Sequence, residues 1–295
     1  MQNKNNRLRA DMLLLLVAVI WGSAFSAQRV AAENFGFFLF NGLRFLLGAL
    51  TVLVFLRGRD LKFTSEELMG GSLAGIVLIS AATLQHAGLR FTTAGKAGFI
   101  TGLYVVLVPL FLTVFWHKIP TPNAWFASLL AVAGMFLLSM DGSSRMGLGD
   151  GLELAGAVMW AFHVIIIGFL AKKTNGLRLA FVQYVVCGFL GTVTGLLLEF
   201  NTLSGLPEVW WAVMYTGVVS VGLGYTLQVI GQQYAPETDS AIILSLESVF
   251  AALFGWIFLK ELLSTQQIFG CLLLLSAMLL AQWSSFQEQK ALRAA

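Results

Sequence analysis

Charged residues are scarce in this chain. Asp, Glu, Lys and Arg together make up 11% of its 295 residues, whereas soluble domains contain about 25%. Hydrophobic residues make up 58%, and the mean hydropathy is +0.81. This shortage of charge is too large for an ordinary soluble domain, so most of the chain must face a solvent other than water.

Several kinds of functional motif are also missing. The two cysteines, Cys187 and Cys271, lie in apolar stretches and give no disulfide framework. His163 has no Cys, Asp or other His nearby for a metal site, and no Walker motif for direct use of ATP is present. We therefore expect no catalytic residue, metal or cofactor, and the net charge of +3 does not indicate nucleic-acid binding.

What the chain does contain is ten long apolar stretches. Eight carry no charge when His is counted as neutral, and two carry one charge each, Arg44 and Glu247. Each is close to or above the ~20 residues that a helix needs to cross ~30 Å of hydrocarbon. None alternates polar with apolar residues as barrel strands do. The sequence therefore predicts an all-α integral membrane protein with ten transmembrane helices. The stretches are Met12–Gln28, Gly36–Leu56, Leu68–Leu89, Ala97–His117, Ile119–Met140, Leu154–Ala171, Leu179–Leu198, Val209–Pro236, Ser240–Leu259 and Leu262–Gln287.

The basic residues outside the stretches indicate an orientation. If the helices alternate in direction, twelve Lys and Arg residues lie on the side of both termini and five lie on the other side. Short cytoplasmic loops carry the excess of Lys and Arg. We therefore expect a multi-pass protein of the cell inner (plasma) membrane with both termini in the cytoplasm.

Two parts of the chain resemble each other. "TLQHAGLRFTTAG" (83–95) and "TLQVIGQQYAPET" (226–238) match at an offset of 143, and "AVIW", ending at Trp21, matches "AVMW", ending at Trp160, at an offset of 139. The chain therefore divides into two five-helix repeats, 1–141 and 142–295. Because five is odd, the second repeat starts on the opposite side of the membrane and is inverted, as in many secondary transporters.

Two segments resemble a known family. "LSLESVFAALFGWIFLKELLSTQQIFGCLLLLSAMLL" and "TGLYVVLVPLFLTVF" are similar to the ninth-to-tenth and fourth helices of the ten-helix EamA-type permeases, in the drug/metabolite transporter superfamily. The resemblance implies a central cavity walled by helices 1–4 and 6–9, with helices 5 and 10 outside. It also implies small organic substrates, often amino acids or other exported metabolites. Ser248 stands where a proline commonly follows the glutamate, and Lys260-Glu261 replaces a common Gly-Glu.

Glu247 is the most informative residue, because a carboxylate within a membrane span must face protein or water. Three interpretations stay open. It forms a structural ion pair or gate with Arg44, which lies at a similar depth; it binds substrate or a coupling proton; or it is an isolated, protonated group. A stripe of small residues lies beside Glu247 and predicts close packing of its helix. The stripe consists of Ser245, Ser248, Ala252 and Gly255.

Further candidates for substrate binding are polar or aromatic residues within the spans. Gln85 and Gln228 are equivalent in the two repeats, as are Tyr104 and Glu247. Two neutral amides suit a zwitterion, and indole rings can bound an apolar or cationic group. For the aromatic residues, ordinary core packing is the alternative. The full set is Trp21, Gln85, Tyr104, Trp160, His163, Tyr225, Gln228 and Glu247. Lys96 and Asp239 also correspond across the repeat and are expected at an interface.

These features together predict a secondary transporter that moves a small organic metabolite by alternating access. Export of amino acids or related metabolites is our first expectation, and uptake of a polyamine, nucleoside or quaternary amine is the second. An intramembrane enzyme or lipid-handling protein is the alternative of another class; it would need a nucleophile–base pair or metal cluster in the spans. The partners are a small-molecule substrate and the lipid bilayer. Proton coupling, and whether the chain is a monomer or homodimer, stay open.

Overall fold

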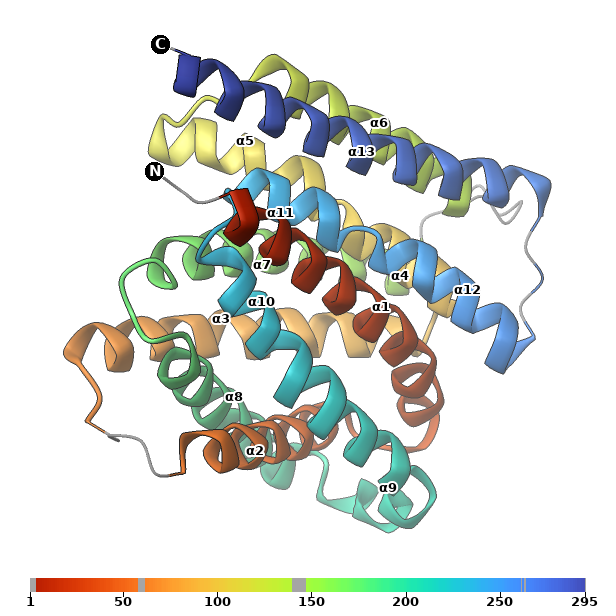
Figure 1. The fold of residues 1–295 in the computed structure, drawn as a ribbon. Helices are drawn as coiled ribbons and strands as arrows, with labels where there is room; N and C mark the ends of the chain where they lie inside the picture. Colours follow the sequence, from red (N-terminus) through yellow and green to blue (C-terminus); the bar gives the residue numbers. More distant parts are fainter. Residues whose placement is uncertain (1–3, 58–61, 140–146, 261, 263, 295) are drawn as a thin grey trace.

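The computed structural model describes residues 4–57, 62–139, 147–260, 262 and 264–294, and within these ranges the ordered elements are all helical (Figure 1). The first half contains α1 (Lys4–Asn34), α2 (Phe37–Leu56), α3 (Ser65–Leu89), α4 (Ala94–Gly102), α5 (Tyr104–Trp116) and α6 (Pro122–Ser139). The second half contains α7 (Leu148–Leu170), α8 (Gly176–Leu198), η1 (Phe200–Gly205), α9 (Leu206–Tyr215), η2 (Thr216–Tyr225), α10 (Thr226–Gln232), α11 (Glu237–Leu244), α12 (Glu247–Leu259) and α13 (Thr265–Ala294).

These elements form ten membrane spans in the described part of the chain, and each of the ten predicted stretches falls on one of them. Eight spans are long and apolar enough to cross a bilayer, and α6 and α13 contain shorter apolar stretches, Pro122–Leu137 and Thr265–Leu280. The predicted fold class is therefore confirmed. The predicted boundary between the repeats, at 141/142, lies outside the described residues.

The spans alternate in direction, so α1 begins and α13 ends at the same end of the bundle (Figure 1). We call this the N-terminal end and the opposite one the far end. The helices α6 and α13 pack against each other along one side of the bundle. This is the outside position that the family resemblance implied for helices 5 and 10.

Two spans are interrupted at equivalent positions. The span α4–α5 breaks at Leu103, and the span α11–α12 breaks at Ser245 and Leu246. The two breaks coincide at the offset of 143 found in the sequence. The segments before the breaks, α4 and α11, have nine and eight residues. At 1.5 Å per residue, each break lies about 12–14 Å from the end of the bundle at which its span starts, near the middle of a ~30 Å layer. Discontinuous helices of this kind form substrate sites in secondary transporters.

Proline does not cause these breaks. Pro109 lies inside α5, six residues beyond the break, and its equivalent in the second half is Ala252. Close packing of the two broken spans is common to both breaks. The Ser248 hydroxyl donates a hydrogen bond of 2.6 Å to the Gly98 carbonyl, and a Cβ on Gly98 would lie 3.0 Å from the Ala251 Cβ. The stripe of small residues thus lies at a helix crossing, as the sequence predicted.

Candidate functional site

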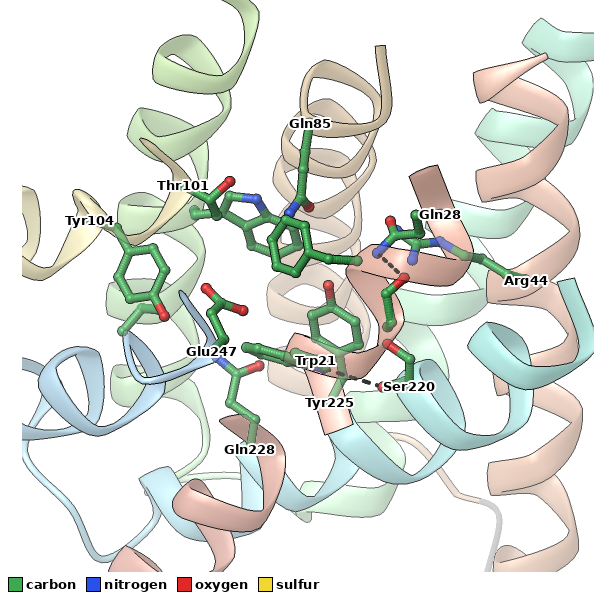
Figure 2. A pocket seen from close by; sticks show the side chains of 14 residues that line it. Trp21, Gln28, Arg44, Gln85, Thr101, Tyr104, Ser220, Tyr225, Gln228 and Glu247 are labelled. Atoms are coloured by element: carbon green, nitrogen blue, oxygen red, sulfur yellow. Dashed lines mark hydrogen bonds between the residues drawn. The ribbon is translucent and has the colours of Figure 1, made fainter. Parts of the chain in front are cut away.

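A small cavity lies between the two halves near the helix breaks. Side chains from α1, α2, α3, α4, α5, α7, η2, α10 and α12 form its wall (Figure 2). The lining residues are Trp21, Ala24, Phe25, Gln28, Arg44, Gln85, Thr101, Tyr104, Trp160, Val164, Ser220, Tyr225, Gln228 and Glu247. Its volume of ≈ 20 Å³ holds about one water molecule. The surrounding helices must therefore move apart to admit any organic substrate.

Arg44, on α2, is the positive group of this wall. It is 1% exposed, and its Nε donates a hydrogen bond of 2.9 Å to Asn41 Oδ1. Asn41 is itself oriented by donating to the Ala82 carbonyl, at 3.2 Å. The guanidinium carbon lies 5.0 Å from the ring centre of Phe45 and 5.5 Å from that of Phe40, close enough for cation–π attraction.

One end of this guanidinium is unsatisfied. Arg44 Nη2 has no hydrogen-bond partner, and no carboxylate of the described residues lies within 4 Å of the group. A buried charge without a counter-ion is costly, so such a group marks a place where an anion binds. Arg44 therefore brings to the cavity wall a buried side chain that no described carboxylate neutralises within 4 Å.

Glu247 is the negative group of the same wall. It is the first residue of α12, directly after the break, and is 4% exposed. The N-terminus of a helix favours a negative charge, which suits a carboxylate at this position. The Tyr104 hydroxyl points toward the Glu247 carboxyl group (Figure 2). The equivalent residues Tyr104 and Glu247 thus meet from the two broken spans.

Arg44 and Glu247 line one cavity but do not pair with each other. No contact within 4 Å joins them, and the guanidinium bonds to Asn41 instead. In this conformation the ion pair between them, which is one of the three interpretations of Glu247, is not formed. The cavity wall therefore carries a basic and an acidic side chain that do not contact each other.

Aromatic rings form one side of the cavity. The ring centres of Trp21 and Tyr225 are 4.4 Å apart, and Trp160 stacks on Tyr225 at 5.8 Å with an angle of 18°. The Trp21 indole donates a hydrogen bond of 3.3 Å to the Ser220 carbonyl. Ser220 lies in η2, a π-helix, and irregular turns of this kind occur often at functional sites. The aromatic wall is thus anchored to irregular backbone.

Amide side chains supply further hydrogen-bonding groups. Gln228 is fully buried, and neither its nitrogen nor its oxygen has a partner. Gln28 donates to the Ala24 carbonyl at 3.3 Å, while its oxygen is unpartnered, as is the indole nitrogen of Trp160. Buried polar atoms normally form hydrogen bonds. Their concentration here leaves donors and acceptors free for a polar ligand.

Most of the predicted candidates meet at this cavity. Trp21, Gln85, Tyr104, Trp160, Tyr225, Gln228, Glu247 and Arg44 all line it. His163 instead lies behind the wall, where its Nε2 forms a hydrogen bond of 2.9 Å with Gln183 Oε1 and its ring meets that of Trp160 edge-on. Whether the lining residues bind substrate stays a prediction.

Sequence reasoning missed three polar residues of the wall. These are Gln28, Thr101 and Ser220. The rule that an amide within a span needs a partner, which identified Gln85, applies equally to Gln28. The hydroxyl residues gave no such signal, because Ser and Thr occur at many helix contacts in membranes.

Ten spans in two inverted repeats around a central cavity are the arrangement found in many membrane transporters. Comparison with known proteins identifies the family. The sequence model described as "EamA-like transporter family" matches residues 8–140 and 147–283. The chain belongs to this family, within the drug/metabolite transporter superfamily, and is a multi-pass membrane transporter of small molecules and not an enzyme.

Individual relatives agree with this assignment. An "uncharacterized transporter" of Archaeoglobus fulgidus is 34% identical over 93% of this chain and 86% of its own. The threonine/homoserine exporter RhtA of Salmonella typhimurium is 26% identical over 80% of this chain and 79% of its own. A solved crystal structure that covers 94% of this chain and 98% of its own superposes with a TM-score of 0.77 at 17% identity, which supports the fold alone.

Proposed function

We propose that this transporter exports small neutral amino acids, which it binds as zwitterions in the central cavity. The observation that carries the proposal is the presence of Arg44 and Glu247 on one cavity wall without a bond between them. Arg44 binds the substrate carboxylate and Glu247 binds its ammonium group. The similarity to a threonine/homoserine exporter adds support for this class of substrate.

The charged residues of the cavity wall favour this proposal over the alternative, uptake of a polyamine or quaternary amine. Such cations would gain from Glu247 but would be repelled by the buried Arg44, which no carboxylate among the described residues neutralises within 4 Å. A zwitterion satisfies both groups. The free amide atoms of Gln28 and Gln228 suit a hydroxyl-bearing side chain.

The small size of the cavity supports an alternating-access cycle. In this conformation it holds about one water molecule, so loading requires the two halves to separate at one end. We propose that the N-terminal end faces the cytoplasm of an inner (plasma) membrane, because the sequence assigns twelve basic residues to the side of both termini and five to the other side.

Ligand analogues and cavity variants test the proposal together. Binding of threonine, threoninol, which lacks the carboxylate, and N-acetylthreonine, which lacks the ammonium, is measured on the purified protein. We expect Arg44→Gln to weaken threonine binding by the ~1.5–3 kcal/mol of a charged hydrogen bond, roughly tenfold to a hundredfold. The same variant should not weaken the binding of threoninol, because threoninol has no carboxylate for Arg44 to bind and its positive charge is no longer repelled. Glu247→Gln should weaken threonine but not N-acetylthreonine.

The exposed pair Arg29 and Glu33 on α1 provides matched controls, since its side chains lie outside the cavity wall. Arg29→Gln and Glu33→Gln make the same chemical changes and should bind threonine like the wild type. If wild-type protein binds threoninol as tightly as threonine, Arg44 does not hold the carboxylate and the proposal fails.

A further inference from the structure

Glu153 is a buried carboxylate that the substrate site does not use. It lies on α7 with no exposed surface. Its Oε2 accepts a hydrogen bond of 2.9 Å from the Thr101 hydroxyl, and its Oε1 has no partner. None of the ion pairs of the described residues includes it. An ionisable group buried in a membrane span without a cation is costly and usually has a function in transport.

The surroundings of Glu153 connect the cavity with the far end. Toward the cavity, its hydrogen-bond donor Thr101 is itself a lining residue. Toward the far end, one helical turn away, Asp150 forms an ion pair of 3.0 Å with Lys96 of α4. Polar groups therefore follow one another from the helix ends to the cavity wall.

The ionisable groups that act on Glu153 come from three helices. Asp150 lies on its own helix with its partner Lys96 on α4, and Glu247 of α12 acts across the cavity. From α3, the backbone of Gly88 packs closely against Glu153: a Cβ added to this glycine would lie 2.8 Å from Glu153 Oε1. His86 of α3 instead bonds to the Gln28 carbonyl, at 3.2 Å.

The inverted repeat provides an internal comparison. The offset of 139 makes Leu14 the equivalent of Glu153, and the offset of 143 makes Leu244 the equivalent of Thr101. Both leucines are fully buried in one hydrophobic cluster. A Cβ on Gly231, the equivalent of Gly88, would lie 3.0 Å from Leu14 Cδ2, so the same contact recurs. The fold thus accepts leucine at this place, and the carboxylate is not required for packing.

We propose that Glu153 is a proton-binding site that makes transport proton-coupled, with proton entry from the far end. A proton that enters past Asp150 and Lys96 binds the Glu153 carboxylate and neutralises it. The proton then leaves toward Thr101 and the cavity, and the Glu153 carboxylate forms again. Leu14 and Leu244 close the equivalent path at the N-terminal end. The proton site does not depend on which substrate is carried.

The first test needs no substrate. Infrared spectra of the purified full chain in lipid, recorded across a pH series, reveal carboxylic acid groups by their C=O stretch. We expect a pH-dependent carboxylic acid band in the wild type that is absent in Glu153→Gln and retained in the control Glu33→Gln. If the wild-type and Glu153→Gln spectra change identically with pH, Glu153 binds no proton in this range and the proposal is overturned.

The second test separates proton coupling from threonine transport itself. In proteoliposomes, a pH gradient should drive accumulation of labelled threonine by the wild type. Glu153→Gln should lose at least nine tenths of this accumulation while it keeps threonine exchange at zero gradient. Accumulation at the wild-type level in Glu153→Gln would overturn the proposal. If threonine is not carried at all, the proposed substrate fails and the infrared result alone decides the proton site.

A double variant covers the case in which Glu153→Gln does not fold. Glu153→Leu combined with Thr101→Leu recreates the packing that Leu14 and Leu244 already form at the other end. This variant should fold and lack the pH-dependent band of Glu153. Unchanged gradient-driven accumulation by the folded double variant would again overturn the proposal.

Discussion

The two ends of the bundle are closed by equivalent positions that carry different charges. At the far end, Lys96 of α4 pairs directly with Asp150 of α7, at 3.0 Å. The repeat offsets make Asp239 and Asp11 the equivalent residues at the N-terminal end, so a lysine–aspartate pair is replaced there by two acids. Arg7 bridges them, at 2.9 Å from Asp11 and 2.8 Å from Asp239.

The N-terminal end also carries further links between helices. Lys172 pairs with Glu237 at 2.7 Å, and Arg178 of α8 pairs with Glu67 of α3 at 3.1 Å. In the described part of the chain, the Lys96–Asp150 pair is the one ion pair that joins helices at the far end. Inverted repeats therefore provide the same frame at both ends, and the charged residues decide how firmly each end is held.

The largest effect is expected when the bridge at the N-terminal end is removed. Arg7→Gln removes a cation that contacts both Asp11 and Asp239. Breaking a buried ion pair costs about 3–5 kcal/mol, so the melting temperature should fall clearly. The cavity should also become reachable from the N-terminal end. We would measure labelling of Ser220→Cys by a membrane-impermeant maleimide, after both native cysteines are replaced by alanine.

The repeat itself provides the control for this change. Asp239→Lys, added to Arg7→Gln, puts a lysine at the position equivalent to Lys96 and opposite Asp11. The double variant should regain most of the lost stability and protect the cavity again. If it is no more stable than Arg7→Gln alone, the two ends are not interchangeable and the comparison is wrong.

A smaller effect is expected at the far end. Lys96→Gln removes a pair whose lysine side chain is 18% exposed, so the loss in stability should be about 1 kcal/mol. The same cysteine should then react faster from the far end and no faster from the N-terminal end. Arg29→Gln, which removes an exposed cation from α1, is the control. A loss as large as that of Arg7→Gln would mean that the far end is held equally firmly.

The sequence predicted the membrane spans better than the details within them. Gaps between charges located all ten spans, because hydrocarbon tolerates few charges over ~20 residues. The same criterion concealed Glu153: the predicted stretch began at Leu154, directly after the charge, whereas α7 begins at Leu148. A buried carboxylate one turn inside a span looks like a span boundary when only the sequence is read.

Long-range arrangements were also beyond the sequence. Arg7 and Asp239 are 232 positions apart, and only the fold brings them together. A proline inside a span favours a kink, but the break lies at Leu103, six residues before Pro109, and recurs at Leu246 in a span without an equivalent proline. Polar residues within spans were the more reliable signal, because Gln85, Gln228, Arg44 and Glu247 all reach the cavity wall.

The smallest effect concerns a carboxylate at the far end that bonds to backbone instead of to a cation. Glu199, at the end of α8, accepts hydrogen bonds from the Phe38 and Leu39 amides at the start of α2, at 2.9 and 3.0 Å. Burial outweighs these bonds and raises the pKa of the Glu199 carboxyl above its ordinary value. Its contribution to stability is therefore fully present below the unfolded pKa of about 4.3 and is lost as pH rises through the higher folded pKa.

We expect the melting temperature of the wild type to decrease slightly over this pH range, and that of Glu199→Gln to decrease less. The control is Glu208→Gln, on α9 at the same end, which should keep the wild-type pH dependence. Thermal unfolding across the pH series measures the difference. A wild-type melting temperature that rises over this range while Glu199→Gln stays flat would mean that the backbone bonds outweigh burial, and that Glu199 holds the far end most firmly when ionised.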